Sequence, residues 1–329
     1  MKNSLIALAA LACAGSALAQ SSATLYGRID TGIGSEKING ASNTQVFSGQ
    51  LSTSRIGLRG AEDLGGGLKA NFNLEGTLAA DTGVVGGGNG FFDRQSWVGL
   101  SGGFGSFKAG RSDTAFDDIR DLAVVNNLWD SEFSPTKIAY TAGVGDYSSR
   151  ASNMLRYDTP SLGGFSAGVS YALDENDAQK RDVTAYNLRY RAGALDLGLG
   201  FQQQKHEATP ASDREYTALS ASYKFDALRL SGGWQRAENG AGLEDDEYSV
   251  GVAVPFGAFE LTAGYAWSKS ETAAGATSAK GKAFSVGGTY SLSKRTRLYA
   301  AMLDGEVENG AGAITTDRRL FALGVRHDF

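Results

Sequence analysis

The stretch STSRIGLRGAEDLGGGLKANFNLE, residues 52–75, decides the fold because its side chains alternate in character along the chain. Arg55 and Arg59 fall on one side of an extended backbone, and Ile56 and Leu58 fall on the other. Beyond the glycines the same alternation sets Lys69, Asn71, Asn73 and Glu75 against Leu68, Ala70, Phe72 and Leu74. Alternation with a period of two indicates a strand with two unlike faces, and two such strands joined by a Gly-rich turn indicate an antiparallel hairpin.

The composition of the 329-residue chain is that of a folded protein with many turns. Hydrophobic residues make up 42% and charged residues 20%, which argues against disorder. The 45 glycines suit tight turns and closely packed strands, and the 4 prolines are few, as expected where each backbone N–H must donate to a ladder. A formal net charge of −5 argues against general nucleic-acid binding.

The first twenty residues differ from the rest of the chain. Lys2 is followed by the apolar run LIALAALACAG and then by the small residues ALAQ, which is the three-part pattern of a secretory signal. We expect residues 1–20 to be a signal peptide and residues 21–329 to form the mature domain. The only cysteine, Cys13, lies in this segment, where a lipidation site is the weaker alternative.

Alternating segments of about ten residues recur to the end of the chain, from ATLYGRIDTGIG (23–34) to RRLFALGVRHDF (318–329). The joints between them alternate in kind. Short joints such as LGGG, SLGG and FGA are typical of hairpin turns, and longer polar joints such as SEKINGASNTQ, AENGAGLEDD and ENGAGAITTD lie between them. We expect 16 strands, an even number that lets an antiparallel barrel close with both termini on one side.

The expected fold is therefore all-β, a 16-stranded antiparallel transmembrane β-barrel. No later segment offers 18 consecutive apolar residues, and in hydrocarbon only a closed barrel leaves no strand edge without hydrogen bonds. Ile56, Leu58, Phe72 and Leu74 would then face lipid, and their charged neighbours would face an aqueous lumen. Aromatic residues assigned to the two interfaces are Tyr26, Trp97, Tyr157, Tyr171, Trp267 and Tyr290.

One joint is far longer than the others. Residues 112–149 carry several acidic residues together with apolar side chains such as Ile119 and Phe133, which need burial. A connection beyond about fifteen residues usually has a functional reason. We expect this third outer loop to fold into the lumen and narrow it, and an outward loop that packs on itself is the alternative.

Three motifs suggest other chemistry. GFSAG (164–168) matches a nucleophile-elbow pattern around Ser166, but that pattern needs a strand–turn–helix context and a catalytic histidine. His206 and His327 are the only histidines, and neither has partners at metal-ligand spacing. LEDDE (243–247) is interpreted as a solvated loop, with contacts to divalent cations and lipopolysaccharide as the alternative. We therefore expect no enzymatic activity, no catalytic residue, no metal and no cofactor.

Several segments in the expected order resemble the general-diffusion porins of Gram-negative bacteria, and the betaproteobacterial trimeric type in particular. They are ATLYGRIDTGIG, STSRIGLRGAEDLGGGLKANFNLE, RQSWVGLSGGFGSFKAGR, LRYDTPSLGGFSAGVSYA, LSKRT and the terminal GVRHDF. The resemblance implies a homotrimer in the outer membrane. It further implies partners: lipid, lipopolysaccharide, the barrel-assembly machinery, and small hydrophilic solutes and ions, with no nucleic acid among them.

The resemblance also assigns site residues. It implies that Arg55, Arg94 and Arg150 face the inward loop across a constriction, with Glu75 close to them. The loop acids expected to point into this gap are Asp113, Asp117, Asp118 and Asp121. Phe329 fits the aromatic C-terminus that the assembly machinery recognises.

The function that follows is passive diffusion through a water-filled channel with facing rows of opposite charge. The sign of ion selectivity stays open, since three arginines oppose an acidic loop. Three alternatives are a plugged barrel or adhesin, an outer-membrane barrel enzyme and a soluble secreted all-β protein.

Overall fold

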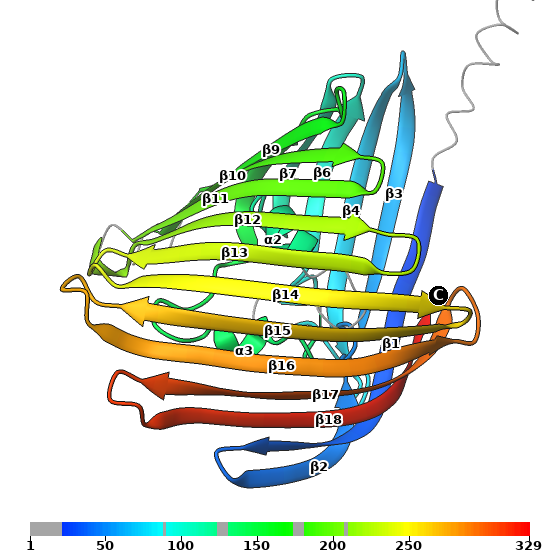
Figure 1. Cartoon of the computed structure of the whole chain (residues 1–329). Coiled ribbons are helices and arrows are strands. Elements are labelled where there is room, and N and C mark those ends of the chain that lie inside the picture. Colours follow the sequence, from blue (N-terminus) through cyan, green and yellow to red (C-terminus); the bar gives the residue numbers. More distant parts are fainter. Residues whose placement is uncertain (1–21, 88–89, 124–130, 174–180, 207–209) are drawn as a thin grey trace, which may run out of the picture.

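The computed structural model describes residues 22–87, 90–123, 131–173, 181–206 and 210–329. The predicted signal peptide lies outside these ranges. Within them, none of the helices is both long enough and apolar enough to cross a bilayer. The described chain is almost entirely antiparallel sheet, in agreement with the alternation in the sequence (Figure 1).

The strands are β1 (Ser22–Ile38), β2 (Ala41–Ser48), β3 (Arg55–Gly65), β4 (Leu68–Ala79), β5 (Val84–Val85), β6 (Gln95–Gly102), β7 (Gly105–Asp113), β8 (Arg150–Asp158), β9 (Phe165–Ala172), β10 (Arg181–Ala192), β11 (Leu195–His206), β12 (Arg214–Lys224), β13 (Arg229–Asn239), β14 (Glu244–Phe256), β15 (Phe259–Glu271), β16 (Thr277–Ser291), β17 (Thr296–Asn309) and β18 (Ile314–Asp328). The helices are α2 (Asp117–Ala123), α3 (Thr136–Ala139) and the 3₁₀ turn η1 (Pro210–Ser212).

The sheet closes into a ring because β1 pairs with β18, from Arg28 opposite Asp328 to Ile38 opposite Arg318. On its other side β1 pairs with β3 through its first half and with β2 through its second half, so β2 and β3 together fill one position in the wall. Among the described residues, the two-residue β5 pairs with the end of β4 and takes no position of its own in the ring. The wall therefore has 16 strand positions, which confirms the predicted 16-stranded antiparallel barrel.

The two faces of the wall differ as the opening stretch predicts. Leu58 lies opposite Leu74, while Arg59 lies opposite Asn73, so the hairpin carries one apolar and one polar face. Large apolar side chains are exposed around the ring, including Leu199, Leu219, Val250, Phe284 and Phe321. Such a surface suits lipid rather than water.

Four of the six aromatic residues assigned to the interfaces share that outward parity, whereas Tyr26 and Trp97 do not. The Tyr26 hydroxyl donates to Glu75, and Trp97 lies in register opposite Asn73, so both rings are on the polar inner face. Their assignment to the interfaces was wrong, since aromatic character alone does not fix the side of a strand.

Several joints that the sequence presents as long polar loops are mostly strand. SEKINGASNTQ pairs with itself as the end of β1 and the start of β2, with the turn at Asn39 and Gly40. β13 and β14 are separated only by residues 240–243, and β17 and β18 only by 310–313. Polar residues extend these hairpins because their side chains need no apolar surroundings there.

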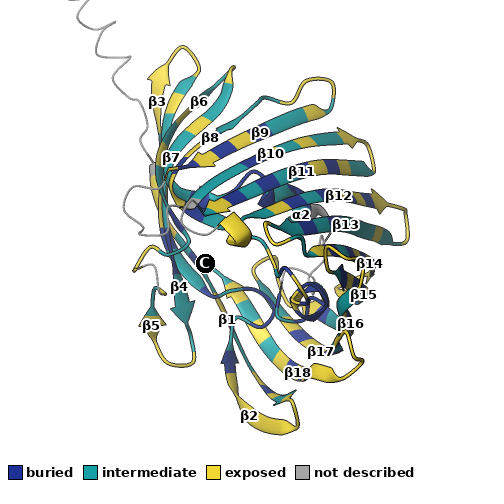
Figure 2. Cartoon of the chain, turned by 90° about the vertical axis from the view of Figure 1, so that its left-hand side faces the viewer, coloured by how far each residue is buried: buried dark blue, intermediate teal, exposed yellow. Residues whose placement is uncertain are grey.

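The long connection after β7 runs from residue 114 to 149. It begins two residues later than predicted, because Ser112 and Asp113 are the last residues of β7. α2 contacts β10 to β14 and α3 contacts β15 to β17. Both helices lie within the ring of strands in two perpendicular views (Figures 1 and 2).

Two buried clusters hold this connection against the wall. Phe116 and Ile119 pack with Tyr216 and with alanines of β10, β12 and β13, and Phe133 and Ile138 pack near Tyr299. All four of these connection side chains are almost completely buried. Burial of each such side chain contributes about 1.5–3 kcal/mol and holds the described parts of the segment against the wall.

Candidate pore constriction

A cavity of about 580 Å³ lies between the inner face of β3, β4, β6, β7 and β8 and the connection 114–149. Its charged lining residues are Arg55, Arg94, Lys108, Arg120, Lys137, Arg150, Glu75, Asp113, Asp117 and Asp146. Six of the seven predicted constriction side chains that the structure describes surround this one cavity; Asp118 does not. We call it the charged cavity.

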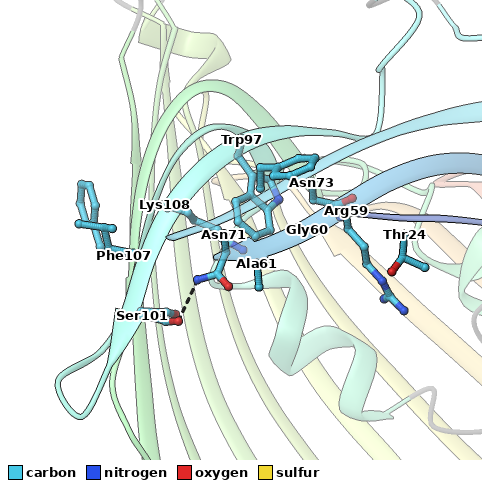
Figure 3. A pocket seen from close by; sticks show the side chains of 14 residues that line it. Thr24, Arg59, Gly60, Ala61, Asn71, Asn73, Trp97, Ser101, Phe107 and Lys108 are labelled. Atoms are coloured by element: carbon cyan, nitrogen blue, oxygen red, sulfur yellow. Dashed lines mark hydrogen bonds between the residues drawn. The ribbon is translucent and has the colours of Figure 1, made fainter. Parts of the chain in front are cut away.

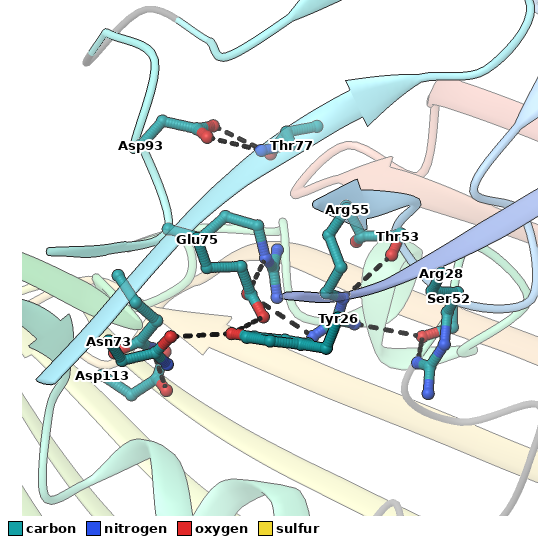
Figure 4. Close-up of polar contacts among 12 residues, drawn as sticks. Tyr26, Arg28, Ser52, Thr53, Arg55, Asn73, Glu75, Thr77, Asp93 and Asp113 are labelled. Carbon is teal, nitrogen blue, oxygen red and sulfur yellow. Dashed lines mark hydrogen bonds and ion pairs between the residues drawn. The ribbon is translucent and has the colours of Figure 1, made fainter. Parts of the chain in front are cut away.

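Glu75 is the centre of the polar contacts on the wall (Figure 4). Its carboxylate accepts a hydrogen bond from Arg94 Nε at 2.6 Å and lies 3.6 Å from Arg55 Nη1. The Tyr26 hydroxyl also donates to it, at 2.9 Å. A buried carboxylate with two guanidinium partners stays ionised and holds both arginines in fixed orientations.

Tyr26 reaches Glu75 by crossing over Gly57, which lies between the two residues in the ladder. A Cβ atom at Gly57 would come within 2.7 Å of the Tyr26 ring. The glycine therefore permits the close approach that joins three strands through one side-chain network.

Arg94 explains an irregularity in the sequence, where it shares parity with the apolar Val98 and Leu100. β6 begins only at Gln95, so Arg94 stands before the strand, and its backbone N–H donates to the Glu75 carbonyl. Because Arg94 lies outside the strand, its side chain need not face outward as those of Val98 and Leu100 do, and it points towards Glu75.

Arg150 is the first residue of β8 and lies opposite Asp113, the last residue of β7. Arg150 Nε is 2.7 Å from Asp113 Oδ1. Asp113 therefore pairs with its neighbour along the wall. The prediction that it belongs to the loop was wrong, although its side chain does line the charged cavity. Register alone brings these two residues together.

The loop acids have three different environments. Asp117 lines the charged cavity, is only 8% exposed and accepts a 2.5 Å hydrogen bond from the Tyr147 hydroxyl. Burial, with the neighbouring negative charge of Asp113, raises the pKa of Asp117 to about 7. Asp118 instead turns to the wall, where it contacts Arg156 and accepts from Asn187 Nδ2 at 3.2 Å. Asp121 lies in α2, and its side chain is outside the described part.

The sequence reasoning missed four basic residues: Lys108, Arg120 and Lys137, which line the cavity, and Arg156, which lies near it. Arg120 in α2 lies over the rings of Tyr140 and Tyr147, at 4.9 and 5.2 Å, and is 3.3 Å from Asp146. Despite its burial, these neighbours raise the pKa of the Arg120 guanidinium. Lys108 and Arg156 could have been found, because both share the inward parity of their strands.

Arg156 attaches the start of the connection to the wall. Its Nη1 donates to the carbonyls of Asp113 and Thr114 at 2.9 and 3.0 Å, while its other nitrogens contact Asp118 and Asp158. The side chain is almost fully buried. A buried arginine with this many acceptors is a structural clamp.

The other motifs have structural roles. Asp245 and Glu247 of LEDDE are fully buried in β14, so the interpretation of this motif as a solvated loop was wrong; Asp245 accepts from the Val144 N–H at 2.6 Å. Ser166 lies within β9, not at a strand–turn–helix junction. Among the described residues no group of three or more His, Cys, Asp or Glu side chains could hold a metal ion.

A closed antiparallel barrel with an apolar outer face, a charged inner cavity and a long connection packed inside defines a protein of the outer-membrane barrel class. The family model for Gram-negative porins matches residues 4–310. The chain belongs to this family of Gram-negative outer-membrane porins, which confirms the resemblance seen in the sequence.

Relatives agree with this assignment. Outer membrane porin protein 32 of Delftia acidovorans is 43% identical over 222 residues, which cover 62% of this chain and 60% of that protein. Major outer membrane protein P.IB of Neisseria meningitidis serogroup A is 33% identical over 216 residues, covering 63% and 61%. The matched region thus spans about three fifths of the length of these relatives. The matching family and the Delftia relative are described as porins, not as enzymes, in agreement with the expectation of no enzymatic activity.

Solved structures show the same fold. The anion-selective porin from Comamonas acidovorans superimposes with a TM-score of 0.79 and 31% identity, covering 94% of this chain and 100% of that one. OmpT of Vibrio cholerae with loop L8 deleted gives a TM-score of 0.74 at 19% identity, covering 94% and 99%, and supports the fold alone.

Proposed function

We propose that the barrel is a water-filled channel for passive diffusion of small hydrophilic solutes and ions, and that the charged cavity is its narrowest part. The proposal is supported by the connection 114–149, which occupies the side of the barrel opposite Arg55, Arg94 and Arg150. A gap lined by fixed charges favours solutes that can exchange their water for polar contacts.

We further propose that the channel prefers anions. The observation that carries this is the charge around the cavity, where, among the residues that the structure describes, six basic side chains outnumber four acidic ones. Glu75 is matched by two arginines and Asp113 by Arg150, while the pKa of Asp117 near 7 leaves this carboxyl partly neutral. The similar Comamonas porin is described as anion-selective, which supports the same sign.

The remaining partners follow from the same proposal. The exposed apolar belt would contact lipid and lipopolysaccharide, and three copies of the chain would assemble as a homotrimer. Phe329, whose backbone pairs with Gly27 at the base of β1, would be the signal that the barrel-assembly machinery reads. Conductance that rises in groups of three steps would support the trimer.

The test is the reversal potential in a KCl gradient across a planar bilayer. The reversal potential of the wild-type protein should have the same sign as the chloride equilibrium potential. The combined change of Arg55, Arg94 and Arg150 to glutamine should shift it towards the potassium equilibrium potential. A matched triple change at Arg236, Lys282 and Arg319, cations of outward parity, should leave it in place. Folded protein that never conducts would contradict the channel, and equal shifts in both variants would contradict the constriction.

A further inference from the structure

A second cavity of about 550 Å³ lies on the inner face of β1, β3, β4, β6 and β7 (Figure 3). Among the residues that line it are Arg59, Asn71, Asn73, Trp97, Ser101 and Lys108. Asn73, Trp97 and Lys108 also line the charged cavity, so the two spaces adjoin. We call the second one the Trp97 pocket.

The position of the Trp97 pocket follows from the ladder. Arg59 is four residues beyond Arg55 along β3, towards the turn after Gly65, which is about 13 Å at the rise of an extended strand. Asn73 lies opposite both Arg59 and Trp97, and Lys108 lies opposite Gly99. A solute that has passed the charged cavity towards the short turns therefore meets this pocket next.

Two basic side chains stand at the two ends of the pocket. Arg59 and Lys108 belong to β3 and β7, which are three strand spacings or about 14 Å apart. In the described part of the chain, neither side chain has a carboxylate within ion-pair distance. Each instead covers an aromatic ring, Arg59 that of Tyr26 at 4.6 Å and Lys108 that of Trp97 at 5.3 Å. Within the described ranges, neither charge is taken up by a direct ion pair, although Asp113, Asp118 and Asp158 lie near enough to Lys108 to interact with it.

The middle of the pocket combines a fixed flat ring with hydrogen-bonding groups. Trp97 Nε1 donates to Gln95 Oε1 at 2.9 Å, which sets the orientation of the indole. Asn71 Nδ2 donates to Ser101 Oγ at 2.8 Å beside the side-chain-free Gly99. An apolar surface with a few placed polar groups is typical of small-molecule sites.

From this arrangement we infer that the Trp97 pocket binds a small organic anion with a flat, unsaturated body, in the class of aromatic carboxylates. The carboxylate is held by the Lys108 ammonium group, and the ring packs on Trp97. Arg59 adds positive potential at the far end. The inference rests on the proposed function, because the anion reaches the pocket through the lumen.

The test uses benzoate as the probe, with cyclohexanecarboxylate as an anion of equal charge and similar size without a flat ring. Benzoate should reduce the chloride current of wild-type channels in a saturable manner, and cyclohexanecarboxylate should do so more weakly. Trp97→Leu and Lys108→Gln should each raise the half-blocking benzoate concentration about tenfold. Trp234→Leu, at an outward position of β13, is the matched control and should leave the block unchanged.

Direct binding of benzoate to the detergent-solubilised protein, measured by saturation-transfer NMR, keeps the test independent of conduction. Loss of this signal in both pocket variants supports the inference. Equal block by the two anions, or unchanged binding after both substitutions, overturns it. A protein that conducts chloride normally but ignores benzoate refutes the pocket alone, whereas a protein that binds benzoate without conducting refutes the channel.

Discussion

The inner face of the barrel is built in two ways. On β1, β3, β4 and β6 to β8 it carries long charged and polar side chains of intermediate burial, which we call the arginine wall. On β10 to β17 it carries small side chains that α2 and α3 cover, which we call the covered wall. Its fully buried alanines are Ala185, Ala218, Ala237, Ala266, Ala283 and Ala301. Figure 2 shows the contrast as uniform shading on β4 and sharp banding on β11 to β17.

The difference teaches that one alternating pattern can serve two purposes. Where the inner face meets water, long polar side chains project into the lumen. Where it meets the connection, small residues let the helices approach the backbone closely and bury Phe116, Ile119 and Phe133. The two sides of the barrel therefore differ: partly exposed charged side chains line one side, and closely packed side chains, with the buried Asp245 and Glu247 among them, line the other.

The largest effect is expected from a bulky residue on the covered wall. A Cβ atom at Gly281 would come within 2.3 Å of the Ala139 carbonyl in α3, where Ser268 also donates at 2.5 Å. Gly281→Val should cost about 1–3 kcal/mol in packing and displace α3, so that single-channel conductance rises.

The control is Gly232→Val, which adds the same bulk on β13 at a position that no residue of the connection contacts among the three nearest atoms. Its conductance should equal that of the wild type. Unchanged conductance in Gly281→Val would mean that the covered wall does not position the connection.

A moderate effect is expected from pH, through Asp117. Its pKa is raised to about 7 by burial, so the packed state binds the proton more tightly than the unfolded chain does. The contribution of this group to stability is therefore complete below its ordinary pKa near 4 and is lost as the pH rises through 7. Lowering the pH from 8 to 6 should also remove negative charge from the cavity and raise the chloride preference by roughly a factor of two.

Asp117→Asn should abolish this pH dependence of the reversal potential, while Asp226→Asn in a short exposed turn should retain it. The idea fails if the channel carrying Asp117→Asn titrates between pH 6 and 8 as the wild type does.

The smallest effect is expected on the arginine wall from Tyr26→Phe. The change removes the hydroxyl contacts to Asn73 and Glu75, at 2.8 and 2.9 Å, but leaves both arginines on Glu75. Stability in urea should fall by about 1 kcal/mol and the reversal potential should stay unchanged. A large shift in the reversal potential would show that Tyr26, and not the ion pairs alone, positions the arginines.

Much of the fold could be predicted from the sequence, because lipid demands an apolar outer residue at every second position whatever the inner face does. Ile119 and Phe133 likewise indicated a connection that packs somewhere sheltered. The covered wall could not be predicted in the same way. In TALSASYKF (217–225) the inner residues Ala218, Ser220 and Ser222 are small but not charged, and nothing local tells what covers them.

The candidate site was predictable where parity and motif agree, as for Arg55 and Glu75. Other site residues could not be predicted, either because they lie outside a strand or because strand pairing brings together residues that are far apart in the sequence. Asp113 pairs with Arg150 because β7 ends and β8 begins at the same level, a fact of pairing that 36 intervening residues conceal. Asp118 turns to Arg156 because helical geometry places it away from Asp117.

The threefold pairing of β1 has a consequence for biogenesis. Each hairpin from β3 onwards pairs strands that are close in the sequence, so it can form locally. The pairing of Arg28–Ile38 with β18, in contrast, joins segments that are almost the whole chain apart. Until β18 pairs with them, β1 and β17 each have an edge whose backbone N–H and C=O groups cannot form hydrogen bonds with acyl chains. The barrel can therefore close only once the last strand has reached the first.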